Sequence, residues 1–536
     1  MTMQAPVLES TPHHSSLQHK LLHQKPARWT GAAFIAALLG GLFYAASQLI
    51  HDLQHVHSPS IFPFVILSIA LLIALGFEFV NGFHDTANAV ATVIYTHSLQ
   101  PHAAVAWSGM WNFLGVLASS GAVAFGILTL LPVELILQVG SNAGFAMVFA
   151  LLVAAILWNV GTWWLGLPSS SSHTLIGSII GVGVANHLMA PGTATSGVDW
   201  GQALNVGRSL LLSPLVGFIG AGFLLTLLRK LVPNPALYAA PEGNAPPPFW
   251  IRTLLILTCT GVSFAHGSND GQKGMGLIML ILIGTVPTAY ALNHAVSSSD
   301  MQDFIAVSAQ ASSVLRHESA EKDVPDAREE LRTYLRTRQL QEHTVVAAAQ
   351  LIEGIGSDLA RFKELAKVPP EDTRNFRNDM YIVGETLRLF DKGGRPAFSD
   401  NDKDVLKNYH KHIDAATKFI PTWVKIAVAI ALGLGTMVGW KRIVVTVGEK
   451  IGKDHLTYAQ GASAELTAMV TIGAADAFGL PVSTTHVLSS GVAGTMAANK
   501  SGLQWGTVRN MLMAWVLTLP VSITLSGTLF WLFSQI

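Results

Sequence analysis

Two short stretches decide the fold: GLPSSSSHTLIGSIIG at residues 166–181 and GLPVSTTHVLSSGVAG at residues 479–494. In each, a proline interrupts an apolar segment and leaves backbone groups without helical partners. Hydroxyl side chains and a histidine follow, at the beginning of a new apolar helix. Because the amide groups and positive dipole end of a helix attract anions, each stretch predicts a broken membrane helix that can bind an oxyanion. The alternative for each stretch alone is ordinary N-capping.

A second pair of stretches shows that the chain contains an internal repeat. GFEFVNGFHDTANAVAT at 76–92 matches GVSFAHGSNDGQKGMGL at 261–277, 185 positions later, whereas the two proline stretches are 313 positions apart. The two offsets differ by 128, which is close to the length of a charged segment between the halves. The halves are therefore equivalent once that segment is removed. Paired interrupted segments at matching places indicate a transporter with its site at the repeat interface.

The charges are concentrated in one part of the chain. Only 12% of the 536 residues are charged and 50% are hydrophobic, against roughly 25% charged residues in an ordinary soluble domain. Of the 66 charged side chains, 39 lie between residues 291 and 418. This distribution predicts an all-α integral membrane protein with one soluble helical insert. A net charge of zero argues against a nucleic-acid binder, and a single cysteine, Cys259, excludes a disulfide framework or a Cys-based metal site.

Apolar runs of about 20 residues predict about ten to twelve membrane-spanning helices. Near the middle of the chain they predict one span over 103–131 and two separate spans over 251–268 and 275–292. We divide the chain into four parts. Residues 1–61 form a polar N-terminal tail plus an additional helix, and residues 62–292 form a first transmembrane half. Residues 293–417 form the charged soluble insert, and residues 418–536 form the remaining transmembrane half, which contains the second proline stretch.

Ionisable residues within membrane segments are costly and therefore mark function. Asp85 and Asp270 occupy equivalent positions of the repeat, and a repeat-related pair beside broken helices favours function over a purely structural role. A small anion close to two carboxylates is repelled unless a cation or proton is also present, which is the requirement for coupled symport. Asn88 can help to bind a cation, whereas the ammonium group at the equivalent position, Lys273, disfavours a metal ion there.

The histidine at the end of each hydroxyl run has two interpretations. His173 and His486 could relay protons, given the near-neutral pKa of histidine, or each could bond within the first turn of its helix. We favour the structural role.

The motifs NGFHDTANAVAT, HGSNDGQKG, GLPSSSSHTLIG and GLPVSTTHVLSSGVAGTM together resemble those of the inorganic phosphate transporter family, in particular its bacterial low-affinity Pit-type permeases of the inner membrane. The resemblance runs from about residue 62 to the end. It implies an inverted-repeat secondary transporter with two hydroxyl-rich helical hairpins. It also implies phosphate uptake coupled to a proton, with phosphate carried as a complex with a divalent metal such as Mg, Ca or Zn.

The same resemblance assigns residues to roles. Phosphate would be held by the hairpin tips, at Ser170, Ser171, Ser172, Ser483, Thr484 and Thr485. The central site and its coupling groups would be Asp85, Asn88, Asn269, Asp270 and Glu465. Lys273 joins this set as a departure, because the wider family often has Asn at that position. It implies no bound cofactor, a multi-pass place in the bacterial inner membrane, and arsenate as a competing analogue.

Other functions remain open at this point. A sodium-coupled phosphate symporter keeps the same anion site with another coupling ion, and a passive anion channel would need no carboxylates. An intramembrane hydrolase is disfavoured because Ser172 and His173 are adjacent and no orienting third group is marked. No nucleotide-binding P-loop is present, and the sequence therefore does not predict an ATP-driven pump or another enzyme. The oligomeric state, a homo-oligomer included, is open.

Overall fold

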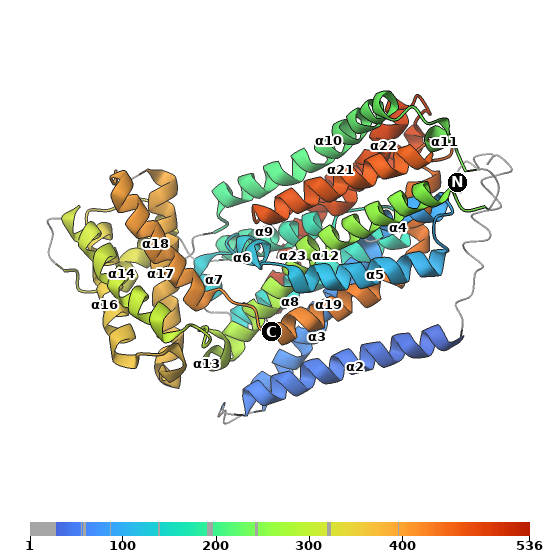
Figure 1. Cartoon of the computed structure of the whole chain (residues 1–536). Coiled ribbons are helices and arrows are strands. Elements are labelled where there is room, and N and C mark those ends of the chain that lie inside the picture. The colour runs from blue at the N-terminus through green and yellow to red at the C-terminus, as the bar shows by residue number, and fades with distance from the viewer. Residues whose placement is uncertain are drawn as a thin grey trace, which may run out of the picture.

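A computed structural model describes residues 28–54, 56, 61–85, 87–137, 140–189, 197–241, 245–318, 323–394 and 396–535. The regular structure of these residues is helical, apart from one isolated β-bridge between Gly452 and Leu503. A long body of helices lies beside a smaller helical cluster, with α2 along one edge of the body (Figure 1). The polar tail, residues 1–27, lies outside the described residues.

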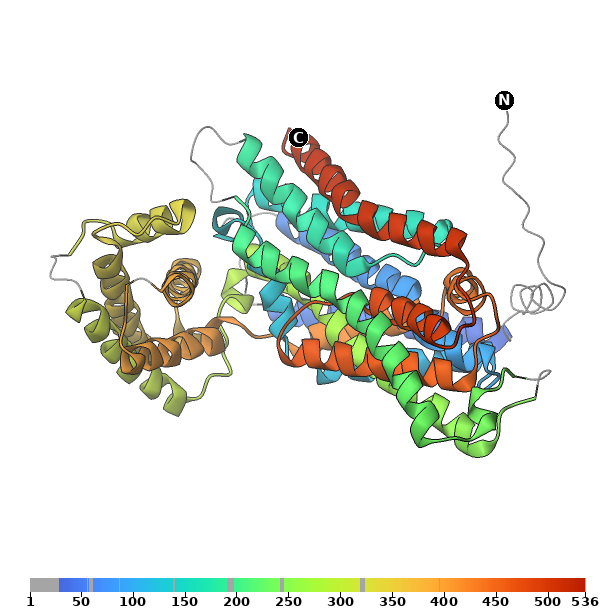
Figure 2. The same cartoon turned by 90° about the horizontal axis from the view of Figure 1, so that it is seen from above.

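The helices of the body come from both sides of the insert (Figures 1 and 2). Those before it are α2 (Arg28–Leu53), α3 (Phe62–Asp85), α4 (Ala87–Tyr95), α5 (Pro101–Ala118), α6 (Ala122–Leu128), α7 (Val133–Leu137), α8 (Asn142–Trp164), α9 (Ser171–Met189), α10 (Trp200–Leu231), α11 (Pro235–Tyr238), α12 (Phe249–Thr285) and α13 (Pro287–Tyr290). Those after it are α19 (Thr422–Thr436), α20 (Lys441–Glu449), α21 (Tyr458–Ala477), α22 (Thr484–Ala498) and α23 (Trp505–Phe533).

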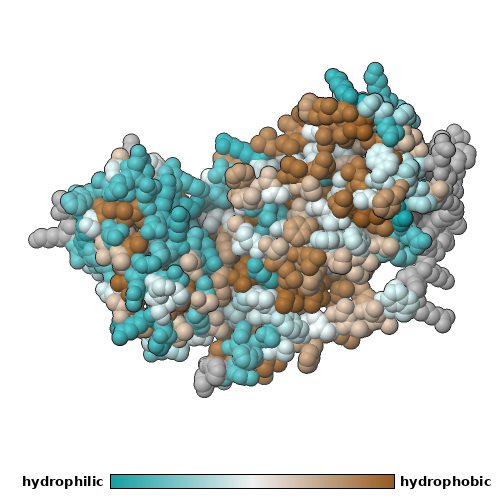
Figure 3. Space-filling model, viewed as in Figure 1, coloured by the Kyte–Doolittle hydropathy of each residue, from teal (hydrophilic) through white to brown (hydrophobic). Residues whose placement is uncertain are grey.

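Among the described residues, six helical stretches are long and apolar enough to cross a membrane, or up to eight if each of two bent pairs is one span. Brown, hydrophobic side chains cover much of the visible face of the body, whereas the smaller cluster is mostly hydrophilic (Figure 3). This count is below the ten to twelve spans that apolar runs predict. Helices α9 and α22 are rich in glycine, serine and threonine and are largely buried, so they need no lipid-facing apolar surface.

Three of the predicted spans were wrong in detail. The segments 251–268 and 275–292 are not separate, because α12 runs continuously for 37 residues from Phe249 to Thr285. The polar residues between them lower the local hydropathy, but this stretch contains no proline and the helix continues. The segment 103–131 is instead broken: α5 and α6 meet at 75°, and Gly121 between them has a φ of 90° that favours glycine.

Each of the two equivalent helices α9 and α22 packs against a helix of the other repeat. Helix α9 packs along α23, and α22, its equivalent, packs along α10. A methyl group at Gly181 would meet the carbonyl oxygen of Ile523, and one at the equivalent Gly494 would meet that of Phe218. Small residues allow this close backbone approach in membrane helix pairs. Each hairpin helix is therefore packed against the other repeat.

The glycine contacts between α3 and α19 predict an effect on stability. A methyl at Gly82 would overlap the carbonyl oxygen of Leu432 and lie 3.0 Å from the backbone nitrogen of Thr436. We expect Gly82→Ala to lower the free energy of unfolding by about 1–3 kcal/mol through overpacking. In the matched control Gly76→Ala, on the same helix, the methyl meets nothing within 4 Å. Thermal unfolding of the detergent-purified variants checks this; equal loss in both would contradict it.

The insert has its own hydrophobic core, in which Phe304, Leu331, Ile352, Phe390 and Tyr409 are buried. Its helices are α14 (Ser298–His317), α15 (Ala327–Thr337), α16 (Thr344–Phe362), η1 (Leu365–Lys367), α17 (Pro370–Gly393) and α18 (Asp400–Thr417).

An ion pair ties the insert to the body. Arg388 of α17 donates to Asp199, the N-cap of α10, at 2.9 Å. Burial opposes ionisation of Asp199, but the Gln202 amide and Arg388 hold the pKa of this carboxyl below its usual range. The pair is therefore ionised at neutral pH.

Candidate functional site

The two hydroxyl-rich stretches begin their helices in the same way. The hydroxyl oxygen of Ser170 accepts a hydrogen bond from the amide of His173 at 3.2 Å. Ser483, at the equivalent position, is the N-cap of α22 and accepts from the amide of His486 at 3.1 Å. Two of the six predicted phosphate-binding hydroxyls therefore cap helices in this structure, as the capping alternative for these stretches supposed.

The prolines leave carbonyl groups that the other repeat satisfies. Trp515 of α23 donates its indole N–H to the carbonyl of Pro168 at 2.8 Å. Ser209 of α10 donates its hydroxyl to the carbonyl of Pro481 at 3.2 Å. Irregular backbone at membrane depth persists only where protein groups satisfy it. Packing between the repeats thus satisfies the non-helical backbone of both broken segments at matching positions.

Both hairpin tips converge on Asp85, which is 4% exposed at the end of α3. Ser171 of the first hairpin donates to one carboxylate oxygen of Asp85, and Thr485 of the second donates to the other at 2.8 Å. His84 Nδ1 lies 2.8 Å from the same oxygen as Thr485. The tips also touch each other, since Ser172 donates to the carbonyl of Val482 at 2.7 Å. Ser171 and Thr485, which come from the two repeats, therefore share one carboxylate.

Lys273 provides the positive charge of the site. Its ammonium group lies 2.7 Å from Asp270 Oδ1 and donates to the hydroxyl of Ser172 at 2.5 Å. Both members of this ion pair are buried. Lys273 therefore connects the second repeat-related aspartate to the tip of the first hairpin, as a donor that an oxyanion can also use.

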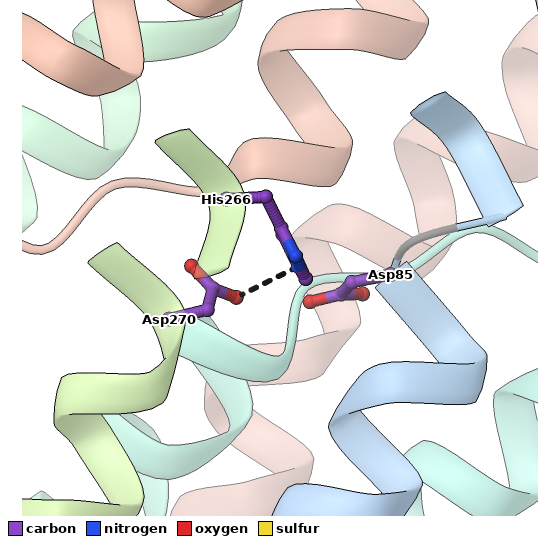
Figure 4. A group of neighbouring side chains, drawn as sticks. All are labelled: Asp85, His266 and Asp270. Carbon is purple, nitrogen blue, oxygen red and sulfur yellow. Dashed lines mark ion pairs between the residues drawn. The ribbon is translucent and has the colours of Figure 1, made fainter. Parts of the chain in front are cut away.

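His266 stands between the two aspartates (Figure 4). Its Nε2 lies 3.5 Å from Asp270 Oδ2, and its Nδ1 lies 2.6 Å from the amide oxygen of Asn112. One ligand atom from each of Asp85, His266 and Asp270 lies within 4.8 Å of the other two. Two carboxylates and an imidazole suit either a proton or a divalent cation such as Zn or Mn. His266 was not predicted from the sequence.

Asn81 was also missed. Its amide oxygen lies 2.7 Å from the hydroxyl of Ser171, whose single proton it shares with Asp85, and its amide N–H donates to Glu78 at 3.3 Å. A signal for both missed residues existed, because Asn81 and His266 are 185 positions apart and are equivalent in the repeat. Equivalent polar residues one helical turn before each aspartate share its helix face.

Other predicted site residues lie elsewhere or do not join the cluster. Glu465 is buried and accepts hydrogen bonds from Thr92 and, at 2.5 Å, from Thr258, neither of which belongs to a hairpin tip. Asn269 donates to the carbonyl of Leu480 at 3.1 Å. The buried hydroxyl of Thr484 has no hydrogen-bond partner among the described residues. The side chain of Asn88 lies outside the described residues.

The two hairpin histidines lie against each other, with ring centroids 4.6 Å apart. His173 Nδ1 is 2.9 Å from the hydroxyl of Ser170, and His486 stacks on Trp515 with centroids 4.1 Å apart. Among the described residues, no carboxylate pairs with His173. His173 therefore does not belong to a Ser–His–carboxylate group.

The chain is similar in sequence to known proteins. A family model described as the phosphate transporter family matches residues 81–526. The low-affinity inorganic phosphate transporter PitA of Escherichia coli K12 is 42% identical over 489 residues, covering 88% of this chain and 97% of the relative. PitB of the same strain is 41% identical, with the same coverage. A solved structure titled the sodium-dependent phosphate transporter is 19% identical, with a TM-score of 0.49, and covers 88% of this chain and 100% of that chain.

Proposed function

The chain belongs to the phosphate transporter family, and on that premise we propose that it is a secondary transporter that imports inorganic phosphate by symport. It is a multi-pass membrane protein of a transporter family and not an enzyme. The observation that carries the proposal is the convergence of both hairpin tips on Asp85. The relatives named above come from bacteria, and we place the protein in the bacterial inner membrane.

The contacts of Asp85 suggest how a cation and phosphate are coupled. The hydroxyls of Ser171 and Thr485, which an oxyanion needs as donors, are engaged by the Asp85 carboxylate. A phosphate that enters between the tips must share or take over these donors, and the carboxylate repels it. A cation or proton on Asp85 removes this repulsion and weakens the carboxylate's hold on the hydroxyls. Binding of the cation and of the anion is therefore mutually favourable, as coupling requires.

The buried charges support the need for a cation. Asp85 and Asp270 carry two negative charges, and Lys273 carries one positive charge that pairs with Asp270. With neutral histidines the cluster is therefore negative before an anion enters. His266 can complete a site for the co-transported ion between the two aspartates. We propose a proton as the coupling ion, with phosphate carried as a complex with a divalent metal, because the ammonium of Lys273 disfavours a separate sodium site beside Asp270.

Uptake into proteoliposomes tests this proposal. Labelled phosphate is offered under an inward proton gradient, then a sodium gradient, each with and without magnesium. We expect the proton gradient to drive accumulation, magnesium to increase it, and arsenate to compete. Uptake driven by the sodium gradient would show that sodium, and not a proton, is the coupling ion. Phosphate entry that never exceeds the electrochemical equilibrium of phosphate would instead indicate a channel. Absence of phosphate entry from a folded, reconstituted protein would refute phosphate transport.

A further inference from the structure

Helix α3 carries a second buried carboxylate besides Asp85. Glu78 precedes Asp85 by seven residues on this helix and is fully buried. Its Oε1 has no hydrogen-bond partner, and its carboxylate belongs to no ion pair among the described residues. An unpaired charge at membrane depth is costly. The neutral, protonated carboxyl is therefore the less costly form of this side chain.

The carboxyl of Glu78 lies directly against the backbone of α12. A methyl group at Gly274 would overlap both the Oε1 and the Cγ of Glu78. A residue larger than glycine at this position would therefore displace the Glu78 side chain. A proton is a ligand that needs no cavity, and the unpartnered Oε1 can bind one within this packing.

Few charged groups surround Glu78. The charges that act on it are Lys273 and Asp270 of α12, which pair with each other at 2.7 Å and so add little net charge. Of the other helices packed on α3, α8 contains no Asp, Glu, Lys, Arg or His. The one charged residue of α19, Lys425, donates to a backbone carbonyl, and His173 of α9 bonds within its own hairpin. The charge of an ionised Glu78 would therefore be poorly compensated.

A single side chain connects Glu78 to the first hairpin tip. Asn81 donates its amide N–H to Glu78 Oε2 at 3.3 Å, and its amide oxygen lies 2.7 Å from the hydroxyl of Ser171. Ser171 is also the donor to Asp85. A negative charge on Glu78 thus lies one amide group away from a hydroxyl that the oxyanion needs. In a buried site such a charge opposes anion binding, and a proton that neutralises it favours anion binding.

We propose that Glu78 is a proton-binding group of the transport cycle, protonated at Oε1 while phosphate is bound and ionised after phosphate leaves. This role rests on the proposed function, for which it names a side chain that carries a coupling proton, separately from Asp85. Because the proton and the anion favour each other's binding, they bind together and leave together. The equivalent residue of the second repeat is Ser263, whose hydroxyl lies 2.7 Å from that of Ser108. The first repeat alone therefore supplies a carboxyl at this position.

Two modes of transport by the full chain in proteoliposomes test this role. Net uptake under an inward proton gradient requires Glu78 to bind and release a proton, whereas exchange of labelled external for internal phosphate without a gradient does not. Glu78→Gln keeps the size of the side chain and resembles its protonated form. We expect this variant to exchange phosphate at the wild-type rate and to lose proton-driven uptake by about tenfold or more. The matched control is Glu449→Gln, at a buried carboxylate that accepts from Tyr95 at 2.8 Å, and it is expected to keep both modes.

The possible results separate the role of Glu78 from the proposed function. Proton-driven uptake that Glu78→Gln retains would overturn the role of Glu78 and leave the proposed function intact. Absence of proton-driven uptake from the wild type would refute proton coupling itself, and the role of Glu78 with it. Loss of both modes in a folded Glu78→Gln protein would assign Glu78 to phosphate binding and overturn its role as a proton carrier.

A second variant applies if Glu78→Gln does not fold. Glu78→Asp keeps a titratable carboxyl but shortens the side chain by one methylene, which withdraws the carboxyl from Asn81. We expect proton-driven uptake to remain, with its pH dependence displaced from that of the wild type. A pH profile identical to that of the wild type would overturn the role of Glu78.

Discussion

Asp85→Asn is expected to lower phosphate uptake by about 100-fold or more, because this carboxylate accepts hydrogen bonds from both hairpin tips. Each hydrogen bond to a charged group contributes about 1.5–3 kcal/mol, and two of them are weakened together. The amide also lacks the charge that attracts the coupling ion. The side chain keeps its size, and we expect the protein to insert and fold. Initial rates of labelled phosphate uptake in proteoliposomes, normalised to inserted protein, measure the effect.

The matched control for this variant is Asp52→Asn. Asp52 lies on α2 and accepts from Tyr290 at 2.6 Å and from Trp423 at 3.2 Å, so the same substitution is made at a hydrogen-bonded carboxylate away from the hairpins. We expect the control to retain uptake. Full activity of Asp85→Asn would sink the assignment of this residue, and equal losses in both variants would point to a general defect.

Lys273→Met is expected to have the second large effect, on both stability and transport. Removal of the ammonium leaves Asp270 buried without its 2.7 Å partner and removes the donor to Ser172. Breaking a buried ion pair from one side typically costs about 3–5 kcal/mol. We therefore expect a clearly lower unfolding temperature and little uptake, measured on the same purified preparation.

A double variant separates stability from function. Lys273→Met/Asp270→Asn removes both charges of the pair and should recover much of the lost stability without recovering uptake. Lys425→Met is the control, because Lys425 donates to the carbonyl of Ser119 at 2.8 Å and has no ion pair among the described residues. Recovery of uptake in the double variant would show that the pair only supports the structure.

The parts of the fold that could be predicted from the sequence are those that depend on short motifs of neighbouring residues. Proline followed by hydroxyls marked both broken segments, and α9 begins at Ser171 and α22 at Thr484, within the predicted hydroxyl runs. The offset between repeats also marked Asp85 and Asp270 as equivalent. Hydropathy wrongly predicted two separate spans at α12, because polar residues such as Asp270 and Lys273 are typical of a loop. Within the fold, these two residues are buried and pair with each other.

The contacts within the site that the sequence did not predict depend on residues distant in the chain. Ser172 meets Lys273 and Val482 only through packing between repeats. His266 joins the aspartates because α12 brings it one helical turn before Asp270 and against Asn112 of α5. Glu465 is a buried carboxylate, the kind of group that can couple ion binding to transport. Its hydrogen-bond partners, however, are threonines of α4 and α12 and not residues of the hairpin tips. Its coupling role stays a prediction.

The central claim is that the two hairpin tips together hold the transported oxyanion. The most direct test is a structure of the protein with arsenate, in which the anomalous signal of arsenic locates the anion independently of the protein atoms. We expect one peak between the N-termini of α9 and α22, within about 3 Å of hydroxyls from both tips. A peak elsewhere, with Ser171 and Thr485 still bonded to Asp85, would contradict it.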